Sequence, residues 1–305
     1  MIRTIHFPGL TALPLYVAAT KRFFDAQGVA VALTAATNSR ELMTGVLRGA
    51  YEIGQAAIDN LVAYQERQAA PELDVERDLI GIMATTSANL DLVVQPDVQS
   101  YPDLKGKTLA VDALTTGFAF VLRKMLERGG LTESDYRLAA VGGDAARLAA
   151  LKKGEVAGGL LAKDFSKQAL AFGLHKLAES LDVLERYQGT SLFVRRQWAT
   201  ANRDALTAFV RAVRRAHDWI FEQDNAAEAA SILTGNTPGM AADSAPALVA
   251  HLLAKRGGLS RTGAFDIEGL KLVLSLRSQY GEPKRKLDDP SRYFDPSFLA
   301  LAETG

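Results

Sequence analysis

The chain of 305 residues contains no cysteine. Disulfide bonds, thiolate metal sites and cysteine nucleophiles are therefore all excluded. The sequence also lacks the run of ~20 apolar residues that a membrane-spanning helix needs. The N-terminus, MIRTIHFPGL, shows no basic segment followed by a long apolar stretch, which a secretory signal would have. Two interpretations stay open: a periplasmic protein whose signal peptide has been removed, or a cytoplasmic protein if this start is native.

The chain has no excess of charge of either sign, because 35 Lys and Arg balance 35 Asp and Glu. Proteins that bind nucleic acid usually show a basic excess or a basic stripe. A dense basic segment, residues 211–215, is interleaved with Val210 and Val213 at helical spacing, which is typical of a solvated helix face. We therefore expect no nucleic-acid partner.

Motifs for catalysis are also missing: the sequence has no HExxH, GxSxG, GxGxxG or Walker pattern. Of the four histidines, His217 and His251 fall in helical patterns and are interpreted as surface or packing residues. His6 precedes the Pro8-Gly9 loop and could act as a general base, although packing within the sheet is the favoured interpretation. We expect no catalytic residue, no bound metal and no cofactor.

What the chain does have is a regular alternation of short apolar runs with amphipathic segments. Strands are expected at residues 2–7, 29–33, 51–57, 79–84, 90–94, 108–111, 136–141, 156–161 and 192–194. Helices lie between most of them, and such alternation with short connections predicts an α/β protein with mainly parallel sheets. From residue 203 onward the pattern is helical, with helices expected at 205–221, 226–233, 245–255 and 267–280.

The alternation occurs twice, separated by extended crossings near residues 88–95 and 185–195. We therefore expect a discontinuous lobe 1, made of residues 1–90 and 192–305 and including the C-terminal helices. Lobe 2 is expected to comprise residues 91–191. The final DDPSRYFDPSFL segment is interpreted as a tail that docks on lobe 1.

Polar residues follow the expected strands. In VDALTTGFAF, Thr115 and Thr116 precede a helical pattern, and Asn38-Ser39 do the same in the first half. Free N–H groups and the positive end of the helix dipole at such positions favour an anion. A simple helix cap, worth ~1 kcal/mol, explains each loop taken singly. The hypothesis of a ligand site depends on both lobes having such loops where ligands bind in open α/β sheets.

Three segments carry a resemblance to a known family: residues 12–60 (ALPLYVAATKRFFDAQG through EIGQAAIDN), 101–131 (YPDLKGKTLAVDALTTG onward) and 147–161 (RLAALKKGEVAGGLL). Their order and spacing resemble the type 2 periplasmic binding proteins of the sulfonate, nitrate, taurine and thiamine-precursor (NMT1/THI5-like) group of ABC-transporter substrate-binding proteins. The resemblance covers roughly residues 1–220.

This resemblance implies a two-lobed type 2 fold with a ligand cleft between the lobes, and hinge closure around a small sulfonate, carboxylate or heterocyclic precursor. It further implies a monomer in the periplasm that delivers its ligand to the membrane permease of an ABC importer. The ligand-facing residues that it implies are Pro8, Gly9, Leu10, Asn38, Ser39, Ala57, Asp59, Thr86, Ser87, Thr115, Thr116, Gly117, Phe118, Gly142, Lys163 and Asp164.

The charged residues near these positions narrow the class of ligand that we expect. Asp59, Asp112 and Asp164 would lie on or near the rim, with Arg40 or Lys163 to offset them. That balance favours a neutral or zwitterionic ligand over a small dianion. The alternative function is a cleft enzyme of the same fold, with decarboxylase or thiamine-pyrimidine-type chemistry, although thiol-dependent versions are excluded by the missing cysteine. A ligand-sensing module is the third and least favoured interpretation.

Overall fold

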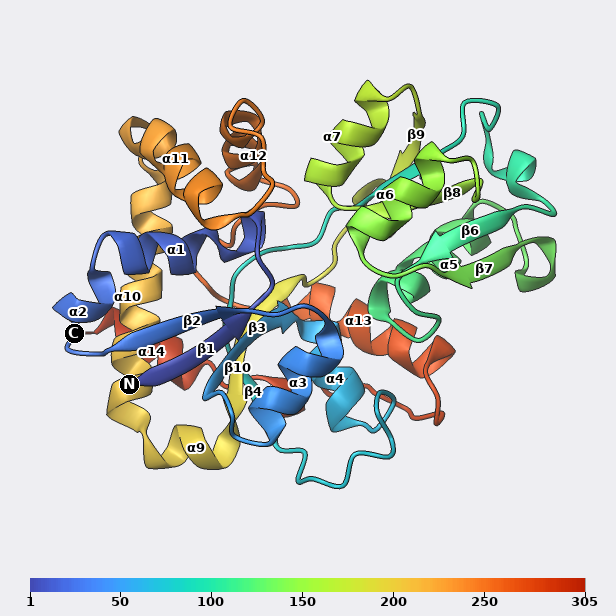
Figure 1. The fold of residues 1–305 in the computed structure, drawn as a ribbon. Helices are drawn as coiled ribbons and strands as arrows, with labels where there is room; N and C mark the ends of the chain where they lie inside the picture. Colours follow the sequence, from blue (N-terminus) through green and yellow to red (C-terminus); the bar gives the residue numbers. More distant parts are fainter. Residues whose placement is uncertain (305) are drawn as a thin grey trace. The chain divides into compact units, whose positions relative to one another are not determined.

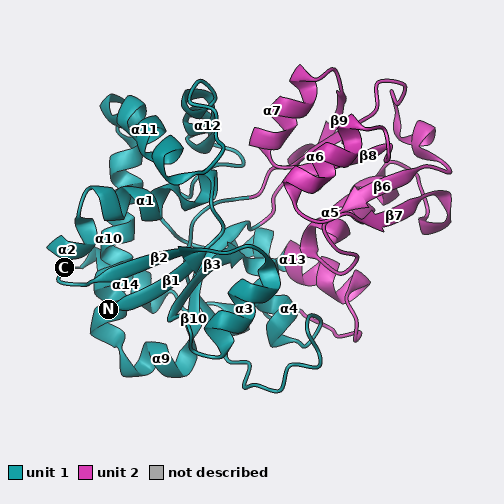
Figure 2. Cartoon of the chain, in the orientation of Figure 1, with its two compact units in different colours: residues 1–87, 188–271, 288–305 teal, residues 88–187, 272–287 magenta. Residues whose placement is uncertain are grey.

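The structure is a computed structural model, and it describes residues 1–304. The chain forms two compact units (Figure 2). Unit 1 comprises Met1–Ser87, Gln188–Lys271 and the chain from Asp288 onward. Unit 2 comprises Ala88–Tyr187 and Leu272–Leu287. Both are α/β units with mixed sheets, as the sequence predicts for the fold class.

Unit 1 contains a five-stranded sheet with the order β2-β1-β3-β10-β4. Its strands are β1 (Ile2–His6), β2 (Val31–Ala35), β3 (Ile53–Ala57), β4 (Leu79–Ala84) and β10 (Thr190–Arg195). β1 pairs in parallel with β2 and β3, whereas β10 runs antiparallel to both β3 and β4. The one reversed strand is thus the first strand after the chain returns to unit 1 at Gln188.

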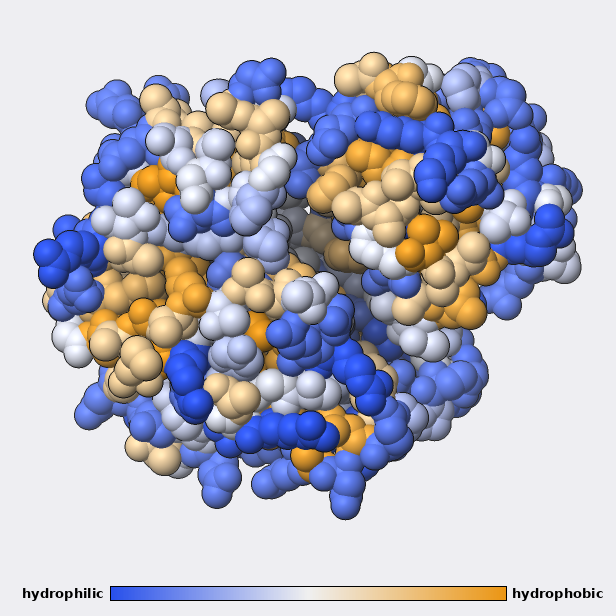
Figure 3. Space-filling model, viewed as in Figure 1, coloured by the Kyte–Doolittle hydropathy of each residue, from blue (hydrophilic) through white to orange (hydrophobic). Residues whose placement is uncertain are grey.

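Helices cover both faces of this sheet (Figure 1). They are α1 (Leu13–Thr20), α2 (Phe23–Ala26), α3 (Ser39–Leu47), α4 (Ile58–Gln65), α9 (Arg196–Ala201), α10 (Arg203–Phe221), α11 (Ala226–Asn236), α12 (Ala245–Leu252) and α14 (Ser297–Glu303), with a 3₁₀ turn η1 at Leu10–Ala12. The main apolar core lies between the sheet and α1, α10 and α11. β2 is an edge strand with half-buried Val31 and Leu33, and Figure 3 shows apolar residues exposed beside it and α1.

Unit 2 repeats this architecture with a sheet of order β7-β6-β8-β5-β9. Its strands are β5 (Asp91–Val94), β6 (Thr108–Val111), β7 (Arg137–Ala140), β8 (Gly158–Leu161) and β9 (His175–Glu179), and its helices are α5 (Gly117–Arg128), α6 (Asp144–Lys152), α7 (Lys163–Ala171) and α8 (Ser180–Leu184). Again one strand is reversed: β5, the first strand after the chain enters the unit, is antiparallel to β8 and β9.

Every strand expected from the sequence is present, with ends shifted by a few residues, but β9 (HKLAE) was not anticipated. Its sequence has three charged or titratable positions and little apolar periodicity. Backbone pairing with β5 makes this segment a strand, and that pairing is a tertiary effect which local pattern does not report.

The second difference concerns α13 (Ile267–Tyr280), which the sequence assigns to lobe 1 with the other C-terminal helices. Residues 272–287 instead belong to unit 2. Their side chains dock on α5: the Tyr280 hydroxyl donates to Glu127 at 2.6 Å, and the buried Arg277 guanidinium lies 4.9 Å from the Phe120 ring centroid. The aromatic and cationic positions of α13 thus complement a helix of the second unit.

The C-terminal tail docks on unit 1, as expected. Tyr293 is fully buried and donates its hydroxyl to Glu66 at 2.8 Å. The Asp295 amide donates to the Gly81 carbonyl at 2.8 Å, so the tail adds backbone contacts to β4. Within residues 1–304, no helix combines the length and apolarity needed to cross a membrane.

Candidate functional site

In unit 1, the loop after β1 carries the first group of candidate ligand residues. Pro8 is exposed, Leu10 is half-buried, and Gly9 adopts φ +122°, a conformation that favours glycine. The Gln55 side-chain amide donates to the Thr11 carbonyl at 3.0 Å and so fixes this loop against the end of β3. Sequence analysis did not single out Gln55, although a polar residue within the apolar run IGQAA was an available signal.

The loop after β2 caps α3. The exposed Asn38 side chain accepts from the Glu41 amide at 2.9 Å, and the Glu41 carboxylate accepts from the Thr37 amide at 2.8 Å and hydroxyl at 2.6 Å. Ser39 is the first helical residue. Arg40 forms an ion pair with the exposed Glu72. The predicted cap is therefore confirmed, and whether Asn38 and Ser39 also contact a ligand stays a prediction.

The loops after β3 and β4 are more enclosed. Ala57 ends β3 and is half-buried, whereas Asp59 lies in the first turn of α4 and is only 4% exposed. Thr86 is also 4% exposed. Its hydroxyl accepts from the Thr190 amide at 3.3 Å, and its carbonyl accepts from the Gly189 amide at 3.1 Å.

The Gln188 side chain also donates to the Thr86 carbonyl, at 3.2 Å. Ser87 forms an isolated bridge with Gln188. Thr86 and Ser87 thus join the chain segment that leaves unit 1 to the one that returns to it.

In unit 2, the Asp112–Phe118 loop contains one cap rather than two. Thr116 is the N-cap of α5: its hydroxyl accepts from the Ala119 amide at 3.3 Å and donates to the Asp112 carboxylate. Thr115 is exposed and makes no cap, so of the two threonines that precede the helical pattern only Thr116 caps the helix, and a capping role is wrong for Thr115. Burial raises the pKa of Asp112, against the opposing effect of the Thr116 hydrogen bond.

The aromatic and glycine candidates of this unit have defined neighbours. Gly117 is the first residue of α5, and the half-buried Phe118 ring lies 6.4 Å from the Tyr187 ring. Gly142 follows β7 with φ +108°, and its carbonyl accepts from the Arg147 guanidinium at 2.7 Å. Both loops are therefore held by contacts within unit 2.

Three carboxylates, Asp112, Asp144 and Asp164, follow the parallel strands of unit 2, and one buried cation, Arg147, acts on the first two. Arg147, 4% exposed, forms an ion pair with Asp144 at 2.9 Å and donates to the Leu160 carbonyl at 3.0 Å. Asp164 lies in the first turn of α7. Burial, together with the neighbouring charge of Asp144, raises the pKa of Asp164 to about 6. Sequence analysis did not identify Arg147, which sits in a helical pattern like any surface arginine.

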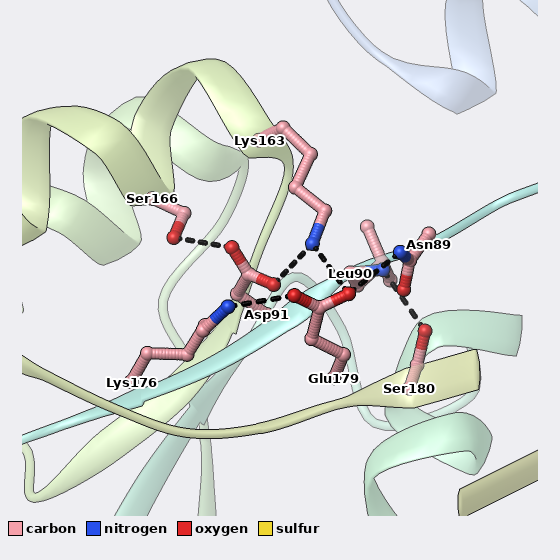
Figure 4. Close-up of polar contacts among 8 residues, drawn as sticks. All are labelled: Asn89, Leu90, Asp91, Lys163, Ser166, Lys176, Glu179 and Ser180. Carbon is pink, nitrogen blue, oxygen red and sulfur yellow. Dashed lines mark hydrogen bonds and ion pairs between the residues drawn. The ribbon is translucent and has the colours of Figure 1, made fainter. Parts of the chain in front are cut away.

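Lys163 is committed to a network of ion pairs and hydrogen bonds (Figure 4). Its ammonium contacts the buried Asp91 and lies 3.1 Å from Glu179. Ser166 donates to Asp91 at 2.6 Å, and Lys176 donates to Glu179 at 2.6 Å. The network joins the start of β5 to the end of β9 and the start of α7.

Glu179 is the most perturbed group of this network. Burial opposes its ionisation, but hydrogen bonds from Lys176, Asn89 and Lys163 outweigh burial and lower the pKa of Glu179 to about 2. The Asn89 amide donates to Glu179 at 2.8 Å. Asp91, in the otherwise apolar run LDLVV, was the available sequence signal for this network, and it was missed.

Burial disfavours the charged form of the two buried histidines. His6 is 2% exposed, its Nδ1 lies 3.1 Å from the Phe7 carbonyl, and burial lowers its pKa. His217 is fully buried with Nδ1 2.9 Å from the Ser260 carbonyl, and burial lowers its pKa to about 3. Among residues 1–304, no three His, Cys, Asp or Glu side chains are placed to hold a metal ion.

Comparison of the fold with solved structures gives relatives at low sequence identity. The periplasmic nitrate-binding protein NrtA of Synechocystis superimposes with a TM-score of 0.82 at 12% identity, covering 99% of this chain and 87% of that one. The periplasmic aliphatic sulphonate-binding protein SsuA of Escherichia coli gives 0.74 at 16% identity, covering 97% and 92%. The desulfurization enzyme DSZB gives 0.69 at 14% identity, covering 99% of both chains.

At such identities the likeness establishes the shared fold, which is that of the periplasmic binding proteins. A search of curated protein sequences gives no match. The sequence model of the NMT1-like family matches residues 6–234. Because this match spans well over half of the chain, the protein belongs to the NMT1-like family.

Proposed function

We propose that this NMT1-like protein is the solute-binding component of an ABC importer, which captures a small organic molecule with the strand-end loops of both units. The observation that carries the proposal is the fold shared over 99% of the chain with a periplasmic nitrate-binding protein. In the proposed mechanism, loop residues of each unit contact the ligand, so that binding favours the closed arrangement by contacts that the open one lacks.

The proposed contacts are the loop residues that the sequence resemblance implies. Exposed Asn38 and Thr115 and half-buried Ser39, Ala57, Ser87 and Phe118 offer hydroxyl, amide and apolar groups. The charges near these loops support a neutral or zwitterionic solute. Lys163 and Arg147 are already paired with carboxylates of their own unit, while burial raises the pKa of Asp112 and Asp164. A small dianion would meet no uncommitted cation among these residues.

The function further implies a periplasmic location, a monomeric protein and a membrane permease as partner. The second candidate is an enzyme that uses the same loops, which is favoured by the likeness to the desulfurization enzyme DSZB over 99% of both chains. Buried His6 and His217 are poor general bases, because burial lowers the pKa of each and neither is open to solvent. This geometry supports binding over proton transfer.

The test is a thermal-shift screen of the purified protein against sulfonates, carboxylates, aromatic acids, nitrate, and pyrimidine or thiamine-like heterocycles. A ligand of the folded state raises the melting temperature by an amount that grows with its concentration. We expect at least one solute to do so and to be recovered unchanged by mass spectrometry. Conversion of the compound would favour the enzyme, and a flat response to every compound would refute both candidates.

A further inference from the structure

One face of the unit 1 sheet carries a band of neutral polar side chains near the carboxyl ends of its strands. In the sheet register His6 lies opposite Gln55, Gln55 opposite Leu192, and Leu192 opposite Met83, so these residues share a face. That face packs on α1 and α10. Thr4 lies on it two residues before His6.

Several atoms of this band, and of α1, α10 and the segment that follows α11, have no hydrogen-bond partner among the described residues. They are Thr4 Oγ1, Gln55 Oε1, Thr85 Oγ1, the Tyr16 hydroxyl, His217 Nε2 and Thr237 Oγ1. All of these residues except Thr237 are at most 3% exposed. Native interiors pair the great majority of such atoms with protein, water or ligand, so a group of them at one sheet edge calls for a partner.

Three of these residues, Tyr16, Gln55 and Thr237, are linked through contacts with common neighbours. The His6 ring meets the Tyr16 ring edge-on at 5.2 Å, and Gln55 is the strand neighbour of His6. Burial raises the pKa of Tyr16, and weak hydrogen bonding with the Gly9 backbone and the Thr237 side chain opposes that rise, so the hydroxyl lies beside both groups. Neither contact has the geometry of a full hydrogen bond. The Gln55 amide nitrogen already donates to Thr11, so its oxygen is the atom left over.

The chemistry of these atoms defines what would satisfy them. The hydroxyls of Tyr16 and Thr237 can donate or accept, and the Gln55 oxygen accepts. His6 is neutral, so no described charge of this band would compensate an ion brought out of water. A partner that both accepts and donates, and carries no charge, fits this set.

We propose that Tyr16, Gln55 and Thr237 form a neutral subsite that takes a hydroxyl or carboxamide group of the transported solute. This proposal rests on the proposed function, and it specifies which chemical group of the solute unit 1 binds. It adjoins the Gly9–Thr11 loop through Gln55 and Tyr16, and the sequence resemblance implies ligand contact at this loop. The rest of the solute is recognised elsewhere.

The experiment measures binding of two matched series in which only one end group changes. The first is propanesulfonate, isethionate, taurine and sulfopropanoate, and the second, on a zwitterionic skeleton, is 2-aminobutanoate, serine, 2,3-diaminopropanoate and aspartate. Each series places a methyl, hydroxyl, ammonium or carboxylate group on a common skeleton. Dissociation constants are measured by calorimetry for the full-length wild type, Tyr16→Phe and Tyr101→Phe. Tyr101 of unit 2 is the matched control, because its hydroxyl also lacks a partner among residues 1–304 but lies outside the strand-end loops.

In at least one series we expect the hydroxyl compound to bind about five- to ten-fold more tightly than the methyl compound. Tyr16→Phe abolishes this difference and Tyr101→Phe preserves it. Ligand-free Tyr16→Phe melts at or above the wild-type temperature, because the hydroxyl that it removes makes no full hydrogen bond within residues 1–304. This last readout separates loss of a ligand contact from loss of structure.

Four results would overturn the subsite: preference for the methyl, ammonium or carboxylate end; a hydroxyl preference that survives in Tyr16→Phe; a melting temperature of ligand-free Tyr16→Phe well below wild type; or no binding in either series. A hydroxyl-free and carboxamide-free ligand from the broader thermal-shift screen would also refute it and leave the proposed function standing. If no solute binds in that screen either, the proposed function itself fails.

Discussion

Unit 1 and unit 2 share one architecture but hold different polar groups at the ends of their strands. In unit 1 these groups are mostly uncharged, and buried atoms of Tyr16, Gln55 and Thr85 have no partner among the described residues. In unit 2 the same region carries charged groups, and most are joined in networks around Lys163 and Arg147. One unit leaves hydrogen-bonding capacity open, whereas the other has largely satisfied its own.

This difference separates two roles that a polar residue near a ligand site can have. A charge that is paired and desolvated stabilises its unit only while its partner is present, so its removal is felt in folding. A buried neutral group without a partner adds no stabilising hydrogen bond and costs desolvation, so its removal does not lower stability and weakens only the binding of a ligand that it contacts. We therefore expect substitutions in the unit 2 networks to change stability, and substitutions in the unit 1 band to change binding.

The largest effect is expected at Asp91. Its carboxylate is 4% exposed and accepts from both Lys163 and Ser166. Asp91→Ala leaves the Lys163 ammonium, itself mostly buried, with Glu179 alone. We expect the free energy of unfolding to fall by about 3 kcal/mol, the loss typical of breaking a buried pair from one side. Urea denaturation followed by circular dichroism measures this change.

Asp97→Ala is the matched control in the same unit. Asp97 pairs with Lys107 at 2.9 Å, but its side chain is 67% exposed. Exposed pairs contribute less than about 1 kcal/mol. If Asp91→Ala costs no more than Asp97→Ala, the Lys163 network does not hold unit 2 together and the contrast between the units is lost.

The next effect tests unit 1 away from its strand-end loops. Tyr293 donates to the buried Glu66 carboxylate, and Arg292 contacts the same carboxylate at 3.2 Å. Tyr293→Phe removes a hydrogen bond to a charged group and is expected to lower the free energy of unfolding by about 2 kcal/mol. Tyr16→Phe, in the same unit, is expected to cause no loss in the free energy of unfolding. Equal losses from the two substitutions would show that Tyr16 has a structural partner.

The sequence predicted the fold well because its signals are local. Apolar runs bounded by breakers marked all strands except β9, and Asn38 marked the start of α3. β9 and the second half of α13 were placed wrongly or not at all. In both cases the deciding contacts, with β5 and with α5, come from segments distant in the sequence.

The candidate site was predictable only as a set of loops. Position after a strand identifies Asn38, Thr116 and Lys163, but it cannot tell a free side chain from a committed one. From the sequence, Lys163 is predicted to contact the ligand. The structure shows instead that its ammonium is paired with Asp91 and Glu179, which are distant in the sequence. The reverse holds for Tyr16 and Gln55, which the sequence does not mark as ligand contacts. The structure shows that the Tyr16 hydroxyl and the Gln55 side-chain oxygen are buried without a hydrogen-bond partner among the described residues.

A smaller effect, with a characteristic pH dependence, is expected at Asp164. Its pKa is raised from 3.8 to about 6 in the folded protein, so the folded state binds more protons than the unfolded state between these values. The free energy of unfolding therefore falls as pH rises through this window. Asp164→Asn removes the penalty and is expected to gain about 1 to 2 kcal/mol at pH 7 and nothing near pH 4.

Glu179→Gln is expected to change the free energy of unfolding in the direction opposite to Asp164→Asn. The pKa of Glu179 is lowered from 4.5 to about 2, so its contribution is present above pH 4.5 and is lost as pH falls towards 2. The substitution is expected to destabilise the protein at pH 7. Thermal unfolding of both variants at several pH values measures these changes, and the same sign for both at pH 7 would contradict the electrostatic account of unit 2.

The smallest effects separate Thr116 from Thr115, neighbours in one loop. Thr116→Ala removes the α5 cap and the hydroxyl that donates to Asp112, and we expect a loss of about 1 kcal/mol in the free energy of unfolding. Thr115 is exposed and no hydrogen bond of its side chain is seen, so Thr115→Ala should change stability by less than about 0.5 kcal/mol.

Under the proposed function, Thr115→Ala is expected to affect ligand binding more than Thr116→Ala, the reverse of their order for stability. Thr115 is the threonine whose hydroxyl is uncommitted, so Thr115→Ala is expected to weaken binding of the solute found in the thermal-shift screen by several-fold. Calorimetric titration of both variants with that solute measures this. A Thr115→Ala protein with wild-type stability and wild-type affinity would remove Thr115 from the site. In unit 2, ligand contact would then have to come from Phe118 or from groups already held in its own networks.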